Sequence, residues 1–232
     1  MDILEGQTGG PIKVTFFGDS TCVGQGVSIY QGWVTKIAKH LDELGKTLNR
    51  EILVSNSSIN GRTTRQALED MPYHIQSQGA DILVVQFGLN DCNYWASDRG
   101  LPRVSRAAFV ANLREIISRA ERFGSKFVFL NNNHPTSRDK QIMTGTSLTY
   151  EESNIQYNMA IRDLAKLLPG FVQFQDMEAH FKQQIRVSKD IGPFLLADGL
   201  HLSAAGHEQY FNLMCPLIQT AVEKIVSVET NS

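Results

Sequence analysis

Two short stretches near opposite ends of the chain contain the residue types of a nucleophile, a base and an orienting acid. Ser20 ends the stretch Gly18-Asp19-Ser20, and His201 ends the stretch Asp198-Gly199-Leu200-His201. Serine is a weak nucleophile until a base takes its proton, and histidine, with an unperturbed pKa of about 6.5, suits that task near neutral pH. Three residues reach at most about 10 Å, so Asp198 can fold back and orient the ring of His201, a task that a backbone carbonyl could also perform. The pattern predicts acyl chemistry, which requires no cofactor or metal.

The elements that must position these residues alternate between strands and helices. Strands that are apolar on both faces and are separated by helices are typical of a parallel sheet covered on both sides, so we expect an α/β fold. Helices are predicted over 33–44 and 107–123, from about 64 with an interruption at Pro72, over about 150–168, and from Ser203 with a kink or restart at Pro216. The predicted strands are Ile12 to Phe17, Ile52 to Ser55, Ile82 to Phe87, Phe127 to Leu130 and Phe171 to Phe174.

The polar segments that follow the first four strands should meet at one rim of this sheet, where parallel α/β sheets bind their ligands. Acyl transfer passes through a tetrahedral oxyanion, which preorganised hydrogen-bond donors stabilise. The rim offers the backbone amide of Ser20, the amide of Gly61 in the Asn60-Gly61 turn, and the side-chain amide of Asn90. We therefore expect these three groups to form an oxyanion hole.

The chain resembles the SGNH hydrolase superfamily, also called the GDSL esterase/lipase family. The resemblance rests on four blocks in the family's order: Gly18-Asp19-Ser20, Asn56 to Gly61, Gly88-Leu89-Asn90-Asp91, and Asp198-Gly199-Leu200-His201. It implies a flavodoxin-like three-layer α/β/α sandwich with a central parallel sheet of about five strands. It also implies Ser20 as nucleophile, Ser20, Gly61 and Asn90 as oxyanion hole, and His201 as base oriented by Asp198. Thr21 departs from the leucine that gives the GDSL name.

Several residues near these blocks are candidates for substrate binding, each with a structural alternative. Asp19 could instead be a helix N-cap, and Arg62 is more simply a solvated residue at a helix start, though it could meet an anionic substrate. Tyr94 and Trp95 could line the site and stack on a sugar, or could anchor their loop. Asn133 and His134 belong to a polar cluster after the fourth strand, where substrate binding is slightly favoured over a hydrogen-bonded scaffold.

Composition excludes several other classes of function. The 232 residues include 42% hydrophobic and 20% charged residues with a net charge of -2, as expected for one globular domain over residues 1–232. Basic residues are not clustered, which argues against nucleic acid as a partner, and no apolar run suits stable membrane insertion. The polar N-terminus does not resemble a secretion signal, and the three cysteines, Cys22, Cys92 and Cys215, suggest no disulfide framework. We therefore expect a cytoplasmic protein.

Two alternative chemistries have weak support. Asp198, His201 and His207 include ligand types for a metal, but no further partner completes a site, so we expect no metal. Cys92 lies beside the Asn90 block and could suggest a thiol mechanism, yet a buried cysteine more commonly acts as a small apolar residue.

The sequence thus predicts a serine esterase that acts on a small-molecule ester through an acyl-enzyme. A short acyl group such as acetyl, on a polar or carbohydrate-like alcohol, fits the polar rim best. An acyltransferase using the same residues, an enzyme for longer acyl chains such as a lipase, lysophospholipase or thioesterase, and a non-catalytic binding module are the alternatives. The sequence does not indicate the oligomeric state.

Overall fold

A five-stranded parallel sheet forms the centre of the protein. The computed structural model describes residues 9–230; most of the N-terminal segment on which the expectation about a secretion signal rests, residues 1–8, lies outside them. The strands follow the order β2-β1-β3-β4-β5, and every neighbouring pair is parallel. Each strand begins and ends within one residue of its predicted bounds. They are β1 (Ile12–Gly18), β2 (Ile52–Asn56), β3 (Ile82–Gln86), β4 (Phe127–Asn131) and β5 (Val172–Gln175).

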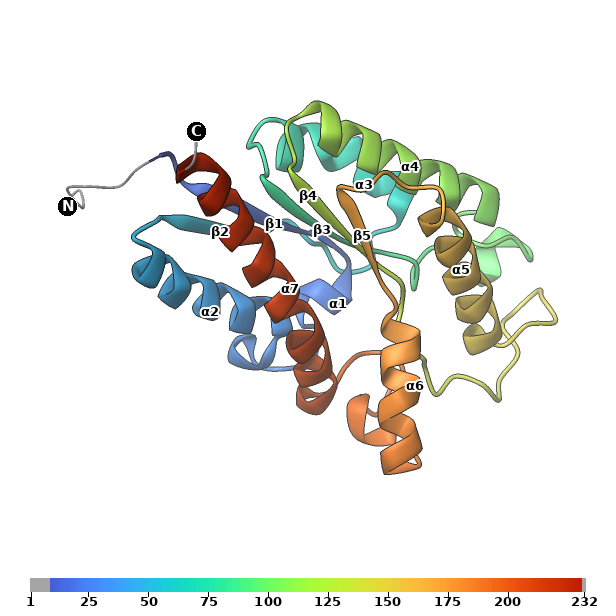
Figure 1. Ribbon diagram of the computed structural model, residues 1–232. Helices are drawn as coiled ribbons and strands as arrows, with labels where there is room; N and C mark the ends of the chain where they lie inside the picture. The colour runs from blue at the N-terminus through green and yellow to red at the C-terminus, as the bar shows by residue number, and fades with distance from the viewer. Residues whose placement is uncertain (1–8, 231–232) are drawn as a thin grey trace.

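Helices cover both faces of the sheet, which gives three layers (Figure 1). One face packs against α2 (Trp33–Leu48), α6 (Met177–Ser188) and α7 (Ala204–Thr230). The other packs against α3 (Thr64–Met71), α4 (Arg106–Arg122) and α5 (Tyr150–Ala165). The predicted α/β/α sandwich is therefore confirmed.

The buried strand residues explain why the sheet needs both layers. Successive side chains of a strand point to opposite faces. In β3, Ile82 and Val84 join the core under α2 and α7, whereas Leu83 and Val85 join the core under α3, α4 and α5. The edge strands β2 and β5 are only partly buried, as expected for strands with one neighbour.

The helices differ from the prediction at Pro216, and one helix was missed. Helix α3 ends at Met71, directly before Pro72, as predicted, and a π-helical turn follows over Pro72–Gln76. Helix α7 runs through Pro216 as a single helix, so the predicted alternative of a restart is wrong. An interior proline costs a helix about 3 kcal/mol, but burial of Met214 and Ile218 on either side of Pro216 offsets such a cost. Helix α6 was not predicted.

The order of the strands determines where the site forms. The chain runs from β1 outward to β2 and then returns to the other side of β1 to form β3, so the direction of strand progression reverses between β1 and β3. Loops diverge at such a switch point and leave a crevice at the carboxyl ends of the strands. The loops that contain Ser20 and Asn90 leave these two strands. Among residues 9–230 no helix combines the length and the apolar character needed to cross a membrane.

Candidate active site

Ser20 lies at a tight turn between β1 and the short helix α1 (Ser20–Val23). A Cβ atom at Gly18 would lie 2.7 Å from both the sulfur of Cys22 and the carbonyl oxygen of Gln86, so the turn requires glycine. Asp19 caps the helix by accepting a hydrogen bond from the amide of Thr21 at 2.9 Å. Ser20 is 7% exposed, so its hydroxyl is held in place at the edge of solvent.

The structure brings Ser20, His201 and Asp198 together in the order that proton transfer requires. The Nε2 atom of His201 lies 3.1 Å from the hydroxyl oxygen of Ser20, and its Nδ1 atom lies 2.5 Å from Oδ2 of Asp198. The other carboxylate oxygen of Asp198 accepts the backbone amides of Leu200 and His201 at 2.9 and 3.0 Å. Burial alone would raise the pKa of Asp198, but these hydrogen bonds outweigh it and hold the pKa below its usual value. A carboxylate, rather than a backbone carbonyl, therefore orients the ring.

His134 supports the loop of the candidate base from the protein interior. Its Nε2 atom lies 2.9 Å from the carbonyl oxygen of Leu200, and its Nδ1 atom lies 3.0 Å from the hydroxyl of Tyr210. A carbonyl can only accept, so Nε2 bears the proton and Nδ1 accepts from the tyrosine. Burial lowers the pKa of His134 to about 4, which keeps the ring neutral. The fully buried side chain is thus part of a scaffold and does not reach the rim.

Two further hydrogen bonds fasten the same loop to the segment after β4. The amide of Ser137 donates to the carbonyl of Gly199 at 3.0 Å, and Nε of Arg138 donates to the carbonyl of Asp198 at 2.9 Å. The segment that follows β4 therefore fixes the backbone of the loop that contains Asp198 and His201. Sequence reasoning did not identify Arg138.

The side-chain amide of Asn90 is oriented by two neighbours of opposite hydrogen-bonding type. Its Nδ2 atom donates to Asp19 at 3.2 Å, and its Oδ1 atom accepts from Arg103 at 3.3 Å. Arginine only donates, so the oxygen of Asn90 must face it, and the second N–H of the amide stays available. Burial raises the pKa of Asp19 to about 6, against the hydrogen bonds from Thr21 and Asn90.

Arg103 also joins Asn90 to the turn that contains Gly61. The same guanidinium nitrogen donates to the carbonyl of Gly61 at 3.0 Å, and the guanidinium lies 4.1 Å from the centre of the Trp95 ring. Gly61 has a φ of 76°, which favours glycine, and nothing lies within 4 Å of where its Cβ would be. One arginine thus connects two of the three expected oxyanion donors. No periodicity or motif distinguishes a single arginine in a long loop, and the sequence prediction missed it.

Two predicted substrate-binding residues lie inside the protein. The expectation that Arg62 is solvated is wrong: its side chain is buried, pairs with Asp70 at 2.9 Å and donates to the carbonyl of Ser57 at 2.7 Å. Asn133 is fully buried and accepts from the side chain of Gln86 at 3.0 Å. With His134, these residues form the scaffold of the rim and not its surface.

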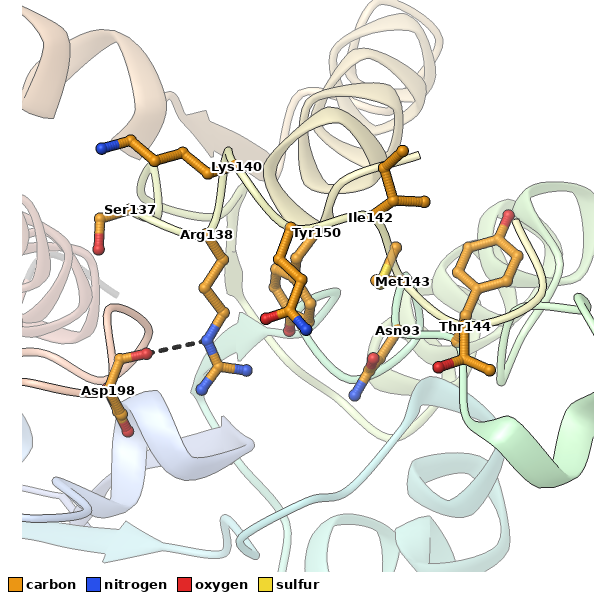
Figure 2. Close-up of a pocket in the computed structure, with 11 residues that line it drawn as sticks. Asn93, Ser137, Arg138, Lys140, Ile142, Met143, Thr144, Tyr150 and Asp198 are labelled. Atoms are coloured by element: carbon orange, nitrogen blue, oxygen red, sulfur yellow. Dashed lines mark hydrogen bonds between the residues drawn. The ribbon is translucent and has the colours of Figure 1, made fainter. Parts of the chain in front are cut away.

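The aromatic residues after Asn90 lie beside two cavities. Tyr94 lines a cavity of about 540 Å³ that extends to Asp198, and its wall includes Arg138 and Tyr150 (Figure 2). Trp95 is 49% exposed and lines a cavity of about 460 Å³ next to Arg103. The structure therefore has open space beside Asp198 and, separately, beside Arg103.

Cys92 and His207, two residues on which the alternative chemistries depend, are buried. Burial raises the pKa of the Cys92 thiol far above its usual range, which opposes a thiolate nucleophile. His207 is 1% exposed, and burial lowers its pKa to about 4. Within residues 9–230 no group of three or more His, Cys, Asp or Glu side chains is arranged to hold a metal ion.

Comparison with known sequences finds a matching family and two similar esterases. The model of the GDSL-like Lipase/Acylhydrolase family matches residues 16–209. An arylesterase of Vibrio mimicus is 24% identical over 161 residues, which span 69% of this chain and 72% of the relative. Esterase TesA of Pseudomonas aeruginosa is 25% identical over 156 residues, 67% of this chain and 69% of the relative.

Solved structures show the same fold. The acetylxylan esterase Axe2 of Geobacillus stearothermophilus superposes with a TM-score of 0.69 at 19% identity, covering 91% of this chain and 95% of that one. The acetyl xylan esterase AlAXEase gives a TM-score of 0.69 at 20% identity, covering 89% of this chain and all of the other. The chain therefore belongs to the GDSL-like lipase/acylhydrolase family, and it is an ester-hydrolysing enzyme.

Proposed function

We propose that the protein is a serine esterase that removes a short acyl group, such as acetyl, from a polar or carbohydrate-like alcohol through an acyl-enzyme. The observation on which the proposal depends is the chain of contacts from Ser20 through His201 to Asp198, with distances of 3.1 and 2.5 Å. This order of nucleophile, base and acid is that of a catalytic triad.

The reaction follows from the positions of these atoms. The hydroxyl oxygen of Ser20 attacks the ester carbonyl while Nε2 of His201 takes its proton, and Asp198 stabilises the resulting imidazolium. The amides of Ser20 and Gly61 and the side chain of Asn90 would donate to the oxyanion. Collapse of the intermediate breaks the bond to the alcohol, which receives the proton from His201. Water then attacks the acyl-serine by the same route and releases the acid.

The polar residues in the walls of the two cavities support the proposal that the alcohol is polar. The cavity beside Asp198 includes Asn93, Arg138 and Lys140, and the cavity beside Arg103 includes Arg65 and the half-exposed ring of Trp95. An exposed indole face offers stacking to the apolar face of a sugar, and amide and guanidinium groups offer hydrogen bonds to its hydroxyls. The names of the two superposed acetyl xylan esterases agree with an acetylated carbohydrate.

A series of p-nitrophenyl esters tests the acyl length. We expect kcat/KM to be highest for acetate and to fall for octanoate and longer chains. Octanoate turnover equal to or above acetate turnover would refute the short-acyl proposal. Intact-protein mass spectrometry of the quenched reaction tests the intermediate: an acetyl adduct on Ser20 is expected, and a Ser20→Ala variant should form none.

A further inference from the structure

The cavity of about 540 Å³ beside Asp198 has more cationic than anionic side chains in its wall. The charged residues in its wall are Arg138, Lys140 and Asp198. Both oxygens of Asp198 are already occupied by the ring of His201 and by two backbone amides. The cavity therefore offers two cations without a free carboxylate in its wall, although the whole chain has a net charge of -2.

Arg138 is held in a fixed orientation that leaves most of its donors available. Its Nε atom donates to the carbonyl of Asp198 at 2.9 Å, and its guanidinium lies 5.5 Å from the centre of the Tyr150 ring. Figure 2 shows the arginine between these two residues. A guanidinium has five N–H donors, and only the one on Nε is used in this contact. A planar guanidinium with its terminal nitrogens free matches the two oxygens of a carboxylate or phosphate.

Glu151 lies next to Arg138, since its backbone amide donates to the carbonyl of Arg138 at 3.1 Å, but its carboxylate is already hydrogen-bonded to other partners. The carboxylate of Glu151 accepts from the amide and hydroxyl of Thr136 at 2.7 and 2.8 Å, and from Asn154 at 3.2 Å. Lys140 is exposed at the rim of the cavity. The positive charges of Arg138 and Lys140 therefore remain available to a ligand that binds in this cavity.

We propose that this cavity is a subsite for an anionic group, a carboxylate or a phosphate, on the alcohol half of the ester. The inference rests on the proposed function. His201 must donate its proton to the departing alcohol, so the alcohol binds next to His201. The cavity reaches the triad at Asp198, the residue that contacts this base. Arg138 binds the anion through its terminal nitrogens, and Lys140 contributes a second charge.

The experiment measures equilibrium binding of three alcohols that differ in charge. Methyl glucuronide, glucose 6-phosphate and neutral methyl glucoside are titrated into the full-length protein by calorimetry. A charge-assisted bidentate contact at a partly exposed site predicts about 10- to 100-fold tighter binding of one or both anionic probes. Preference for the glucuronide indicates a carboxylate ligand, and preference for the phosphate indicates a phosphoryl ligand. Equal affinity for all three probes would overturn the subsite.

Three variants distinguish a local contact with the anion from an effect of the protein's overall charge. Lys140→Gln and Arg138→Gln should each reduce the preference for the anion, with the larger loss at Arg138. Arg65→Gln removes the same charge from the other cavity, and it should leave the preference unchanged. Because Arg138→Gln can also loosen the loop of Asp198, Lys140→Gln is the variant that keeps the fold intact. A Lys140→Gln protein with unaltered preference, or an Arg65→Gln protein with an equal loss, would contradict the assignment.

Turnover distinguishes this inference from the proposed function. In Lys140→Gln, kcat/KM for an O-acetylated methyl glucuronide should fall several-fold relative to kcat/KM for neutral p-nitrophenyl acetate measured on the same protein. A protein that binds anions in this cavity but hydrolyses no ester would contradict the proposed function alone. A Lys140→Gln protein that keeps the wild-type ratio of these two kcat/KM values would contradict the subsite alone.

Discussion

Arg103 allows a quantitative test of how the oxyanion donors are held. It donates to Asn90 at 3.3 Å and to the carbonyl of Gly61 at 3.0 Å, but it belongs to neither predicted block. Replacing Arg103 with methionine removes both hydrogen bonds while retaining an unbranched side chain beside Trp95. Asn90 would then be oriented by Asp19 alone, at 3.2 Å.

The expected fall in kcat for Arg103→Met is smaller than the fall caused by loss of a whole oxyanion donor. Loss of an entire oxyanion donor lowers kcat by about 10²- to 10³-fold. The Arg103–Asn90 contact is long and partly exposed, so it belongs at the lower end of charged hydrogen bonds, about 1.5 kcal/mol, which corresponds to about tenfold in rate. We therefore expect Arg103→Met to lower kcat for p-nitrophenyl acetate about tenfold with little change in KM.

A double-mutant cycle identifies the route of the effect. If Arg103 acts by positioning Asn90, adding Arg103→Met to Asn90→Ala should lower kcat by clearly less than the tenfold expected in the wild-type background. Arg99→Met, an exposed residue of the same loop, serves as the matched control and should keep wild-type kcat. A full tenfold loss in the Asn90→Ala background, or wild-type kcat in Arg103→Met, would refute the reasoning.

Two further predictions use the buried titratable groups. Asp19→Asn would present an amide donor to Thr21 or Asn90, so kcat should fall about tenfold. Because burial raises the pKa of Asp19 to about 6, its contribution to stability is present below about pH 4 and is lost as the pH rises through 6. Relative to wild type, the variant should gain up to about 3 kcal/mol of unfolding free energy between pH 4 and 7.5 in urea titrations, and a pH-independent difference would contradict the assignment. Burial lowers the pKa of His207 to about 4, so its stabilising contribution is present above about pH 6.5 and is lost as the pH falls toward 4. The same titrations on His207→Leu should show wild type losing up to about 3 kcal/mol relative to the variant over that range, and parallel curves would exclude this role.

The sheet was predictable because its strands are buried on both faces. Apolar runs such as Ile82 to Phe87 leave little ambiguity when turn residues bound them and helices separate them. Parallel pairing then brings the segments after β1, β2, β3 and β4 to one rim, which is why Ser20, Gly61 and Asn90 could be expected to lie near one another. His201 directly follows none of these strands, and its contact with Ser20, about 180 positions away in the chain, was expected from the chemistry of the two residue types and from the family resemblance.

The supporting contacts were not predictable, because they depend on how side chains pack in three dimensions. Arg62 resembles a solvated residue in the sequence, yet it is buried against Phe17 and pairs with Asp70. Polar residues at a rim can face the ligand or the interior, and sequence does not separate the two cases for Asn133 and His134. Arg103 and Arg138 each lie in loops without periodicity, and only their partners distinguish them from surface arginines.

The central claim is that Ser20 is a nucleophile activated by His201, and labelling by a fluorophosphonate probe tests it most directly. Wild-type protein should label and hydrolyse p-nitrophenyl acetate, and both activities should vanish in Ser20→Ala. In His201→Ala the rate of labelling should fall by several orders of magnitude, because the serine would lose its base. Failure of folded wild-type protein to label, or undiminished labelling and turnover in Ser20→Ala, would contradict the account.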